Sequence, residues 1–213
     1  MESTKKRVSV PNSIRDSVLR EFNHRCAICG ADRPQIHHID ENPGNNDPGN
    51  LLPICPNCHL TDQHNPTVPA DPEKLALFRR YKDPAILAPQ FEPLFARMRF
   101  LARITDSDHS EELERRAHEL EDFISYFEMG GFYSRAILEL LEAPPRGRVL
   151  PPGGPANPRE QEEEREFEAQ YRQQLRLAQP EVYSLVIESL RYQNWSRSTA
   201  PNTSLAADGW RRR

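Results

Sequence analysis

Long apolar runs are absent from this sequence of 213 residues. A transmembrane helix needs about 20 consecutive apolar residues, and no stretch of the sequence comes near that length, so no membrane-spanning segment is predicted. The basic cluster Lys5, Lys6 and Arg7 is not followed by the apolar stretch of a secretory signal. These absences predict a cytoplasmic protein with no membrane partner.

Excess positive charge is also lacking. Lys and Arg number 28 against 32 Asp and Glu, which gives a net charge of −4 at pH 7. This balance argues against a globally basic coat for nucleic acid and leaves room for local basic patches. Hydrophobic residues make up only 37% of the chain, and the mean hydropathy is −0.78. We therefore expect small structured pieces joined together rather than one large core.

Proline, in contrast, is abundant, with 20 residues in the chain. The stretch APPRGRVLPPGGPANP (143–158) concentrates proline and glycine, forms neither a helix nor a central strand, and is typical of a linker. The sequence predicts an α+β protein in five parts: a small α+β domain over 1–70, a helical domain over 71–142, the linker over 143–158, C-terminal helices over 159–195 and a disordered basic tail over 196–213.

The first 70 residues carry the signals of a helix, two short strands and a second helix. Either Asn12 or Ser13 suits the N-cap of the first helix. A loop rich in Asn, Gly, Pro and Asp separates the strands, and Pro53 confines the second strand to an edge. Pro56 suits the first turn of the second helix. The predicted ranges are 13–22 and 57–63 for the helices, 35–39 and 51–54 for the strands, and 41–49 for the loop.

Further helices are predicted beyond residue 70. Asp71 caps a helix whose first residue is Pro72, and residues 106–110 cap a later one. Gly130-Gly131 is predicted to stop a helix, and Pro180 separates a charged helix over 159–179 from the segment that follows. The helix after residue 110 carries a heptad seam of Leu113, Ala117, Leu120, Ile124 and Phe127.

All four cysteines lie in two Cys-x-x-Cys pairs, Cys26 with Cys29 and Cys55 with Cys58, separated by 25 residues. In a reducing compartment such pairs bind metal more often than they form disulfides, and two pairs are the ligand set of a structural Cys₄ zinc site. The ion would close a fold whose apolar content hardly stabilises it alone. Gly30, directly after the first pair, allows a turn with φ > 0.

Three histidines and an asparagine accompany the cysteines: His37, His38, Asn50 and His59. Adjacent residues of a strand point to opposite faces, so His37 and His38 have different roles, one facing a metal and the other a substrate phosphate. The motifs Cys-x-x-Cys, His-His-Ile, Asn-Leu and Cys-x-x-Cys-His, in this order and spacing, resemble the HNH endonuclease family over roughly residues 12–65. The resemblance implies a small zinc-stapled ββα-metal (HNH) domain followed by an α-helical region.

The resemblance also implies a role for each residue. His38 would be the general base that activates the attacking water, since an imidazole with a pKa of about 6.5 suits that task at neutral pH. His37 and His59 would bind one catalytic divalent ion, Mg²⁺ or Mn²⁺, with Ni²⁺ or Zn²⁺ as further candidates. Asn50, the other catalytic residue, would tie the loop and orient the strand that carries the base. The family's further ligand position corresponds to Gln63, with Asp62 and His64 beside it.

DNA is the partner that the resemblance implies, with hydrolysis of its phosphodiester bonds as the reaction. Arg15, Arg25 and Arg33 are the basic residues expected to contact it. The apolar stripes of the later helices favour a homodimer or docking to a partner protein such as an ATPase subunit. HNH proteins with helical extensions resemble nuclease effectors of bacterial anti-phage defence systems, which makes such an effector one expectation. A zinc-stapled DNA- or protein-binding module without catalytic activity is the alternative.

Overall fold

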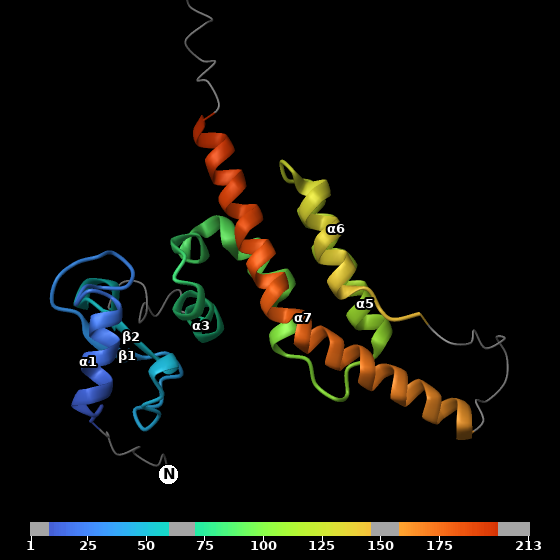
Figure 1. Cartoon of the computed structure of the whole chain (residues 1–213), viewed down its shortest axis with the longest axis horizontal. Coiled ribbons are helices and arrows are strands. Elements are labelled where there is room, and N and C mark those ends of the chain that lie inside the picture. The colour runs from blue at the N-terminus through green and yellow to red at the C-terminus, as the bar shows by residue number, and fades with distance from the viewer. Residues whose placement is uncertain (1–8, 60–70, 146–157, 200–213) are drawn as a thin grey trace, which may run out of the picture. The chain divides into compact units, whose positions relative to one another are not determined.

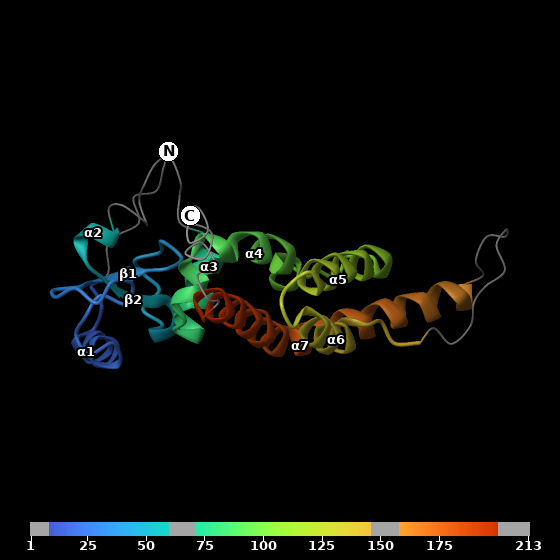
Figure 2. The same cartoon turned by 90° about the horizontal axis from the view of Figure 1, so that it is seen from above.

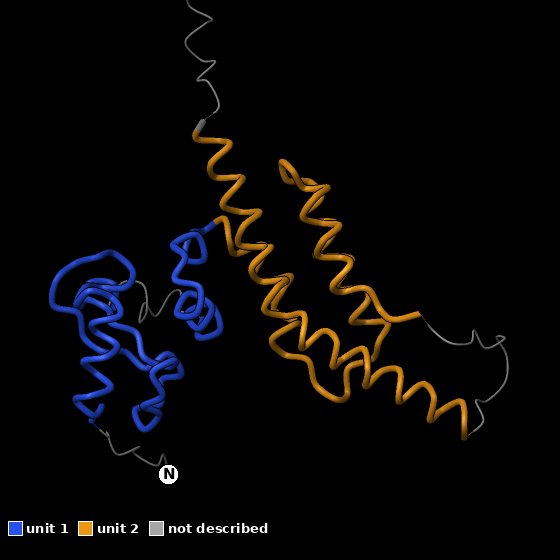
Figure 3. Tube along the Cα trace, in the orientation of Figure 1, with its two compact units in different colours: residues 1–89 blue, residues 90–213 orange. Residues whose placement is uncertain are grey.

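The computed structural model describes residues 9–59, 71–145 and 158–199. Contacts divide the chain into two compact units, residues 1–89 and 90–213, which Figure 3 shows in separate colours. Helices account for most of the described residues, and their one sheet, of two strands, lies in unit 1. None of the helices in the described ranges combines the length and the apolar character that crossing a membrane requires.

Unit 1 is built around a short β-hairpin. α1 (Asn12–Glu21) precedes β1 (Gln35–His38), the 3₁₀ turn η1 (Pro48–Asn50) leads into β2 (Leu51–Ile54), and α2 (Pro56–Cys58) follows at once. The predicted order of strand, loop, strand and helix is confirmed, although residues 60–63 of the predicted second helix lie outside the described residues. In Figure 2 the two strands run between α1 and α2.

The hairpin forms the centre of the unit 1 core. Its strands pair antiparallel, with His37 opposite Leu52 and His38 opposite Leu51, and all four residues of β2 are buried. Because the sheet has only two strands, Pro53 lies in an edge strand, as its missing N–H requires. The Pro53 carbonyl accepts a 2.8 Å hydrogen bond from Ala27 N–H, which joins β2 to the first cysteine turn.

The start of α1 differs from the prediction. Pro11 holds the N-cap position and no side chain caps the helix, so the assignment of Asn12 or Ser13 as the cap is wrong. Pro11 has a φ of −55°, within the narrow range that its ring allows, and its carbonyl accepts a 2.9 Å bond from Arg15 N–H. The backbone of a proline therefore starts the helix in place of a polar side chain.

α3 (Pro72–Tyr81) belongs to unit 1 and is followed by the 3₁₀ turn η3 (Pro84–Leu87). Asp71 accepts a 3.0 Å bond from Glu73 N–H, and Pro72 lies in the first turn, which confirms the predicted start of the helix. The division between the units falls after Pro89, whereas the sequence predicted a domain boundary after residue 70. The buried side chains of α3 are Leu75, Leu77, Phe78 and Arg79.

Unit 2 is helical. After the 3₁₀ turn η4 (Pro89–Phe91) come α4 (Glu92–Met98), the 3₁₀ turn η5 (Arg99–Ala102), α5 (Ser110–Ser125), α6 (Gly130–Leu141) and α7 (Pro158–Thr199). α5 and α6 form a hairpin, and α7 packs against both of them (Figure 1). The seam predicted for α5 is buried at four of its five positions, Leu113, Ala117, Leu120 and Ile124.

The turn between α5 and α6 corrects a second prediction. The sequence predicts that Gly130-Gly131 stops a helix, but α6 begins at Gly130. A Cβ atom at Gly130 would lie 2.4 Å from the carbonyl oxygen of Ile124 and 2.5 Å from that of Ser125. Only glycine therefore lets the start of α6 approach the end of α5 so closely.

Pro180 lies inside α7, so the prediction that it separates two helical segments is wrong. A proline in a helix interior removes one backbone hydrogen bond and costs about 3 kcal/mol. Buried side chains lie on both sides of it, with Tyr171 and Leu175 before and Val182 and Val186 after. This burial offsets the cost, and Figure 1 shows α7 changing direction near its middle, where Pro180 falls in the sequence.

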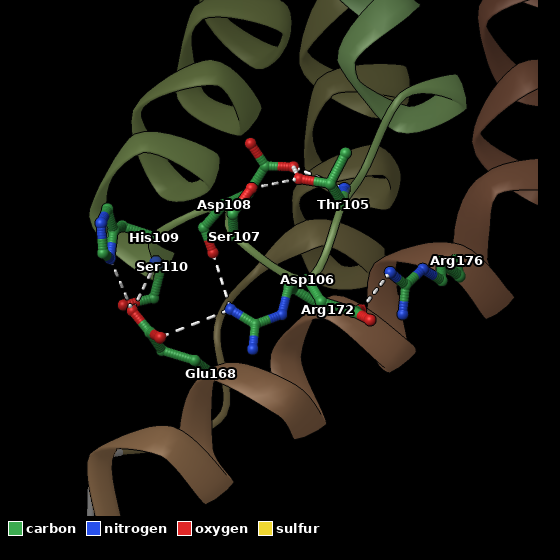
Figure 4. Close-up of polar contacts among 9 residues, drawn as sticks. All are labelled: Thr105, Asp106, Ser107, Asp108, His109, Ser110, Glu168, Arg172 and Arg176. Atoms are coloured by element: carbon green, nitrogen blue, oxygen red, sulfur yellow. Dashed lines mark hydrogen bonds and ion pairs between the residues drawn. The ribbon is translucent and has the colours of Figure 1, made fainter. Parts of the chain in front are cut away.

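The start of α5 is held by a neighbouring helix. Its N-cap residue, His109, lies within the predicted range 106–110, but the His109 side chain makes no cap bond. Glu168 of α7 instead accepts a 3.4 Å bond from Ser110 N–H and lies 3.3 Å from His109 Nδ1 (Figure 4). Arg172 donates a 2.7 Å bond to the Asp108 carbonyl, which attaches the loop before α5 to α7.

Candidate functional site

The four cysteines come together as the sequence predicts. Cys26 and Cys29 lie in the turn between α1 and β1, whereas Cys55 is the N-cap of α2 and Cys58 is its last residue. Their sulfur atoms all lie within 4.8 Å of one another, and Cys29 Sγ is 3.6 Å from Cys55 Sγ. Sulfurs that bind a tetrahedral zinc at about 2.3 Å lie about 3.8 Å apart. The cluster is therefore compatible with a zinc staple.

Both Cys-x-x-Cys turns direct backbone N–H groups at sulfur. Cys58 N–H donates to Cys55 Sγ at 3.5 Å. Burial raises the pKa of the Cys26 thiol, but backbone N–H groups of Cys29, Cys55 and Ile28 outweigh it and lower the pKa to about 7. Zinc binds the thiolate, which such N–H groups stabilise. Gly30 N–H donates to the Cys26 carbonyl at 2.9 Å, and the φ of 74° at Gly30 confirms the conformation predicted there.

His37 and His59 approach each other beside this cluster. Their ring centroids lie 5.1 Å apart, with the edge of one ring toward the face of the other. His37 is buried on β1, and His59 is half-buried directly after α2. Two imidazoles from different elements thus lie close enough to share one ion, and their nitrogens suit Mn²⁺, Ni²⁺ or Zn²⁺ better than Mg²⁺.

A third ligand for such an ion is not found in the described residues. There, the four cysteines form the only group of three or more Cys, His, Asp or Glu side chains whose ligand atoms lie close enough for a metal. The predicted further position, Gln63, and its neighbours Asp62 and His64 lie outside the described residues.

His38 is half-buried, whereas His37 is buried, as expected for adjacent residues of a strand that point to opposite faces. Its Nε2 lies 3.1 Å from Oδ1 of Asn46 in the loop between the strands. An amide oxygen only accepts hydrogen bonds, so a neutral imidazole makes this bond in the tautomer that carries the proton on Nε2 and the lone pair on Nδ1. Sequence reasoning missed Asn46, because a loop so rich in asparagine carries no signal for which one contacts the histidine.

Asn50 joins the two ends of that loop. Its Nδ2 donates to Asp40 Oδ1 at 2.8 Å and to the Asn45 carbonyl at 3.0 Å, while its Oδ1 accepts from Asp40 N–H at 3.0 Å. Its carbonyl also accepts a 2.8 Å bond from Ile39 N–H. The side chain therefore makes the tie that the family resemblance implies, and its catalytic role stays a prediction.

Asp40 is the second residue that sequence reasoning missed. Burial acts to raise the pKa of its carboxyl, but hydrogen bonds from the Asn45 side chain, Asn42 N–H and the Asn50 side chain, together with the charge of His38, hold that pKa below its usual value. Asp40 thus stays ionised at neutral pH, two residues after His38, and accepts hydrogen bonds from several parts of the loop.

The three arginines expected to contact DNA are all exposed. Arg25 also stabilises the first cysteine turn, because it donates to the Gly30 carbonyl at 3.2 Å and lies 3.0 Å from Asp32 Oδ1. Arg15 lies on α1, and Arg33 has a φ of 59° just before β1. Their contact with DNA stays a prediction.

Comparisons of the chain with family models, with curated proteins and with solved structures find no match. The structure itself supports a small ββ unit and a four-cysteine cluster compatible with zinc. The resemblance to the HNH family therefore stays a prediction from the motif.

Proposed function

We propose that unit 1 is a metal-dependent HNH endonuclease that hydrolyses phosphodiester bonds of DNA. The observation that carries the proposal is the division of roles among the three histidines. His37 and His59 approach to 5.1 Å between ring centroids, while His38 is oriented separately by Asn46. A nuclease with one metal needs this combination: two ligands that converge and a base that does not bind the ion.

His38 would act through Nδ1. The hydrogen bond to Asn46 occupies Nε2, so the Nδ1 lone pair is the one that takes a proton from the attacking water. The oxygen of that water forms a bond to phosphorus as the bond to the 3′ oxygen breaks, and the 3′ oxygen takes a proton from a solvent water. By the family resemblance the products carry a 5′ phosphate and a 3′ hydroxyl. A divalent ion held by His37 and His59 would supply charge stabilisation at the phosphate.

Asn50 would support the base indirectly. The two residues directly after His38 are tied to Asn50, by two bonds with Asp40 and by the bond from Ile39 N–H to the Asn50 carbonyl. These bonds fix the backbone directly after His38, which limits the movement of the imidazole. Holding a base within a fraction of an ångström of its working position is worth orders of magnitude in rate.

Nicking of supercoiled plasmid tests the proposal. Wild type, His38→Ala and the control His118→Ala, which removes an exposed histidine of α5, are each assayed with Mg²⁺, Mn²⁺ and Ni²⁺. We expect wild type and His118→Ala to nick equally and His38→Ala to be at least about 100-fold slower, the usual contribution of a general base. Equal behaviour of wild type and His38→Ala with every metal would refute the enzyme and favour a zinc-stapled binding module.

A partner of unit 2 stays a prediction, whether it is a second copy of this chain or the ATPase subunit of an anti-phage system. Tyr126, Met129 and Phe132, around the turn between α5 and α6, expose large apolar side chains that suit such a contact. Co-purification and size measurement test it. A fully active monomer would count against a required partner.

A further inference from the structure

Arg79 of α3 is a buried cation outside the stretch that resembles the HNH family. It is 8% exposed, and its guanidinium group makes four hydrogen bonds. Nη1 and Nη2 donate to the two carboxylate oxygens of Glu21 in α1 at 2.9 and 2.6 Å. Nε donates to the Leu51 carbonyl at 2.9 Å, and Nη2 also donates to the Pro48 carbonyl at 3.1 Å.

The two carbonyls bracket Asn50 in the chain. Pro48 lies two residues before it and Leu51 directly after it, so Arg79 holds the backbone of this segment from one side. On the other side, Asn50 reaches the loop after His38 through Asp40 and through the Ile39 N–H. A continuous set of contacts therefore runs from α1 through Arg79 to the backbone beside His38.

Arginine suits this position for a physical reason. Its planar guanidinium has five donors in a fixed fork, which can bind both oxygens of a carboxylate and still reach carbonyls at its edges. Lys82 offers a comparison within the same helix end. It pairs with the same Glu21 at 2.6 Å, and both Arg79 and Lys82 lie over the ring of Phe22. The Lys82 side chain, however, is 47% exposed.

We propose that Arg79 is a positioning residue for the histidine site, acting through the Pro48 and Leu51 carbonyls on Asn50. The catalytic half of this inference rests on the proposed nuclease function. Its structural half does not, and makes α3 part of the support of the hairpin.

Hydrogen exchange in the full chain tests the structural half. Arg79→Met keeps the volume of the side chain and removes its donors, and Lys82→Met is the matched control. The Ile39 amide, which donates to the Asn50 carbonyl, reports on the tie, and the Ala27 amide, which donates to Pro53, reports on the rest of the hairpin. We expect Ile39 to exchange about 10-fold to 100-fold faster in Arg79→Met with Ala27 little changed, and neither amide to change in Lys82→Met.

An equal loss of protection at Ile39 and Ala27 would overturn the inference, because it would show general destabilisation only. If Arg79→Met fails to fold, Arg79→Lys replaces it. That variant keeps a positive charge near Glu21 but lacks the fork, so Ile39 should again lose protection selectively.

Single-turnover cleavage tests the catalytic half. A positioning role lowers the rate constant about 10-fold to 100-fold at unchanged amplitude, whereas loss of folded protein lowers the amplitude at unchanged rate constant. An unchanged rate constant in folded, zinc-loaded Arg79→Met would refute the catalytic role. Suppose that wild type cleaves no DNA while the Ile39 amide still exchanges faster in Arg79→Met. In that case the proposed function fails, and the structural role of Arg79 stands.

Discussion

The ion pair between Glu21 and Arg79 should contribute a measurable part of the stability of unit 1. The hydrogen bonds from Arg79 are the largest cause of a lowered pKa at Glu21, and the contact with Lys82 adds to it. Together they outweigh the effect of partial burial and lower the pKa from 4.5 to about 2. A lowering of the pKa from 4.5 to about 2 corresponds to about 3.4 kcal/mol at most, for Arg79 and Lys82 together. Because the Glu21 side chain is 34% exposed, solvent screening reduces this figure. We expect about 2 kcal/mol.

Urea unfolding of zinc-loaded protein at pH 7 measures this contribution. Glu21→Gln should lower the free energy of unfolding by about 2 kcal/mol, since the amide keeps the shape of the side chain and removes its charge. Lys82→Met should cost less than about 1 kcal/mol, as exposed pairs do. A double-mutant cycle with Arg79→Met isolates the pair. A coupling energy below about 0.5 kcal/mol would refute the reasoning.

The same pair predicts a pH dependence with a definite sign. The pKa of Glu21 is lower in the folded state than in the unfolded state, so the stability it contributes is fully present above pH 4.5. That contribution falls as the pH drops from 4.5 toward 2. The difference in unfolding free energy between wild type and Glu21→Gln should therefore be constant from pH 7 to pH 5 and smaller at pH 4. A difference that grows on acidification would contradict the assignment.

Three further predictions follow from the site and the fold. Cys58→Ser should abolish zinc binding and unfold unit 1, whereas His59→Ala should leave zinc content and circular dichroism unchanged and abolish nicking; equal unfolding of both would undo the separation of the two metal sites. Asn46→Ala should slow nicking about 10-fold and change the pH–rate profile through the tautomer of His38, with an unchanged profile counting against the contact. Gly130→Ala should lower the thermal unfolding temperature, with a cost of about 1–3 kcal/mol from the clash with the end of α5, and an unchanged temperature would refute it.

Local signals were enough to predict the hairpin and the cysteine cluster. Pro53 marked an edge strand and Pro56 marked the start of α2. Both predictions follow because proline has no backbone N–H to donate in a central strand or a helix interior. The two Cys-x-x-Cys spacings predicted one cluster because each turn can direct two sulfurs at the same point. Each of these signals lies within a few positions of the chain, although the two cysteine pairs that form the cluster are 25 residues apart.

Arg79, which sequence reasoning also missed, acts over long separations. Arg79 contacts Leu51 across 28 positions and Glu21 across 58, and nothing in the local pattern of α3 marks it as a core residue. The same limit explains the error at Gly130, since a glycine that ends a helix and one that permits close approach are identical in sequence. At Pro180 the local cost of proline was predicted, but the burial along α7 that offsets it depends on partners far away in the chain.

The hairpin needs ties at both of its ends. A two-stranded sheet with four residues in each strand is not stable alone in water. At one end Ile54 is followed directly by Cys55, so the cysteine cluster restrains it. At the other end the Leu51 carbonyl is held by Arg79, and this is the end where Leu51 pairs with His38. The cysteine cluster is therefore remote from His38 along the strand, and Arg79 of α3 restrains the backbone opposite His38. The hairpin thus depends on an element outside the stretch that carries the cysteines and histidines.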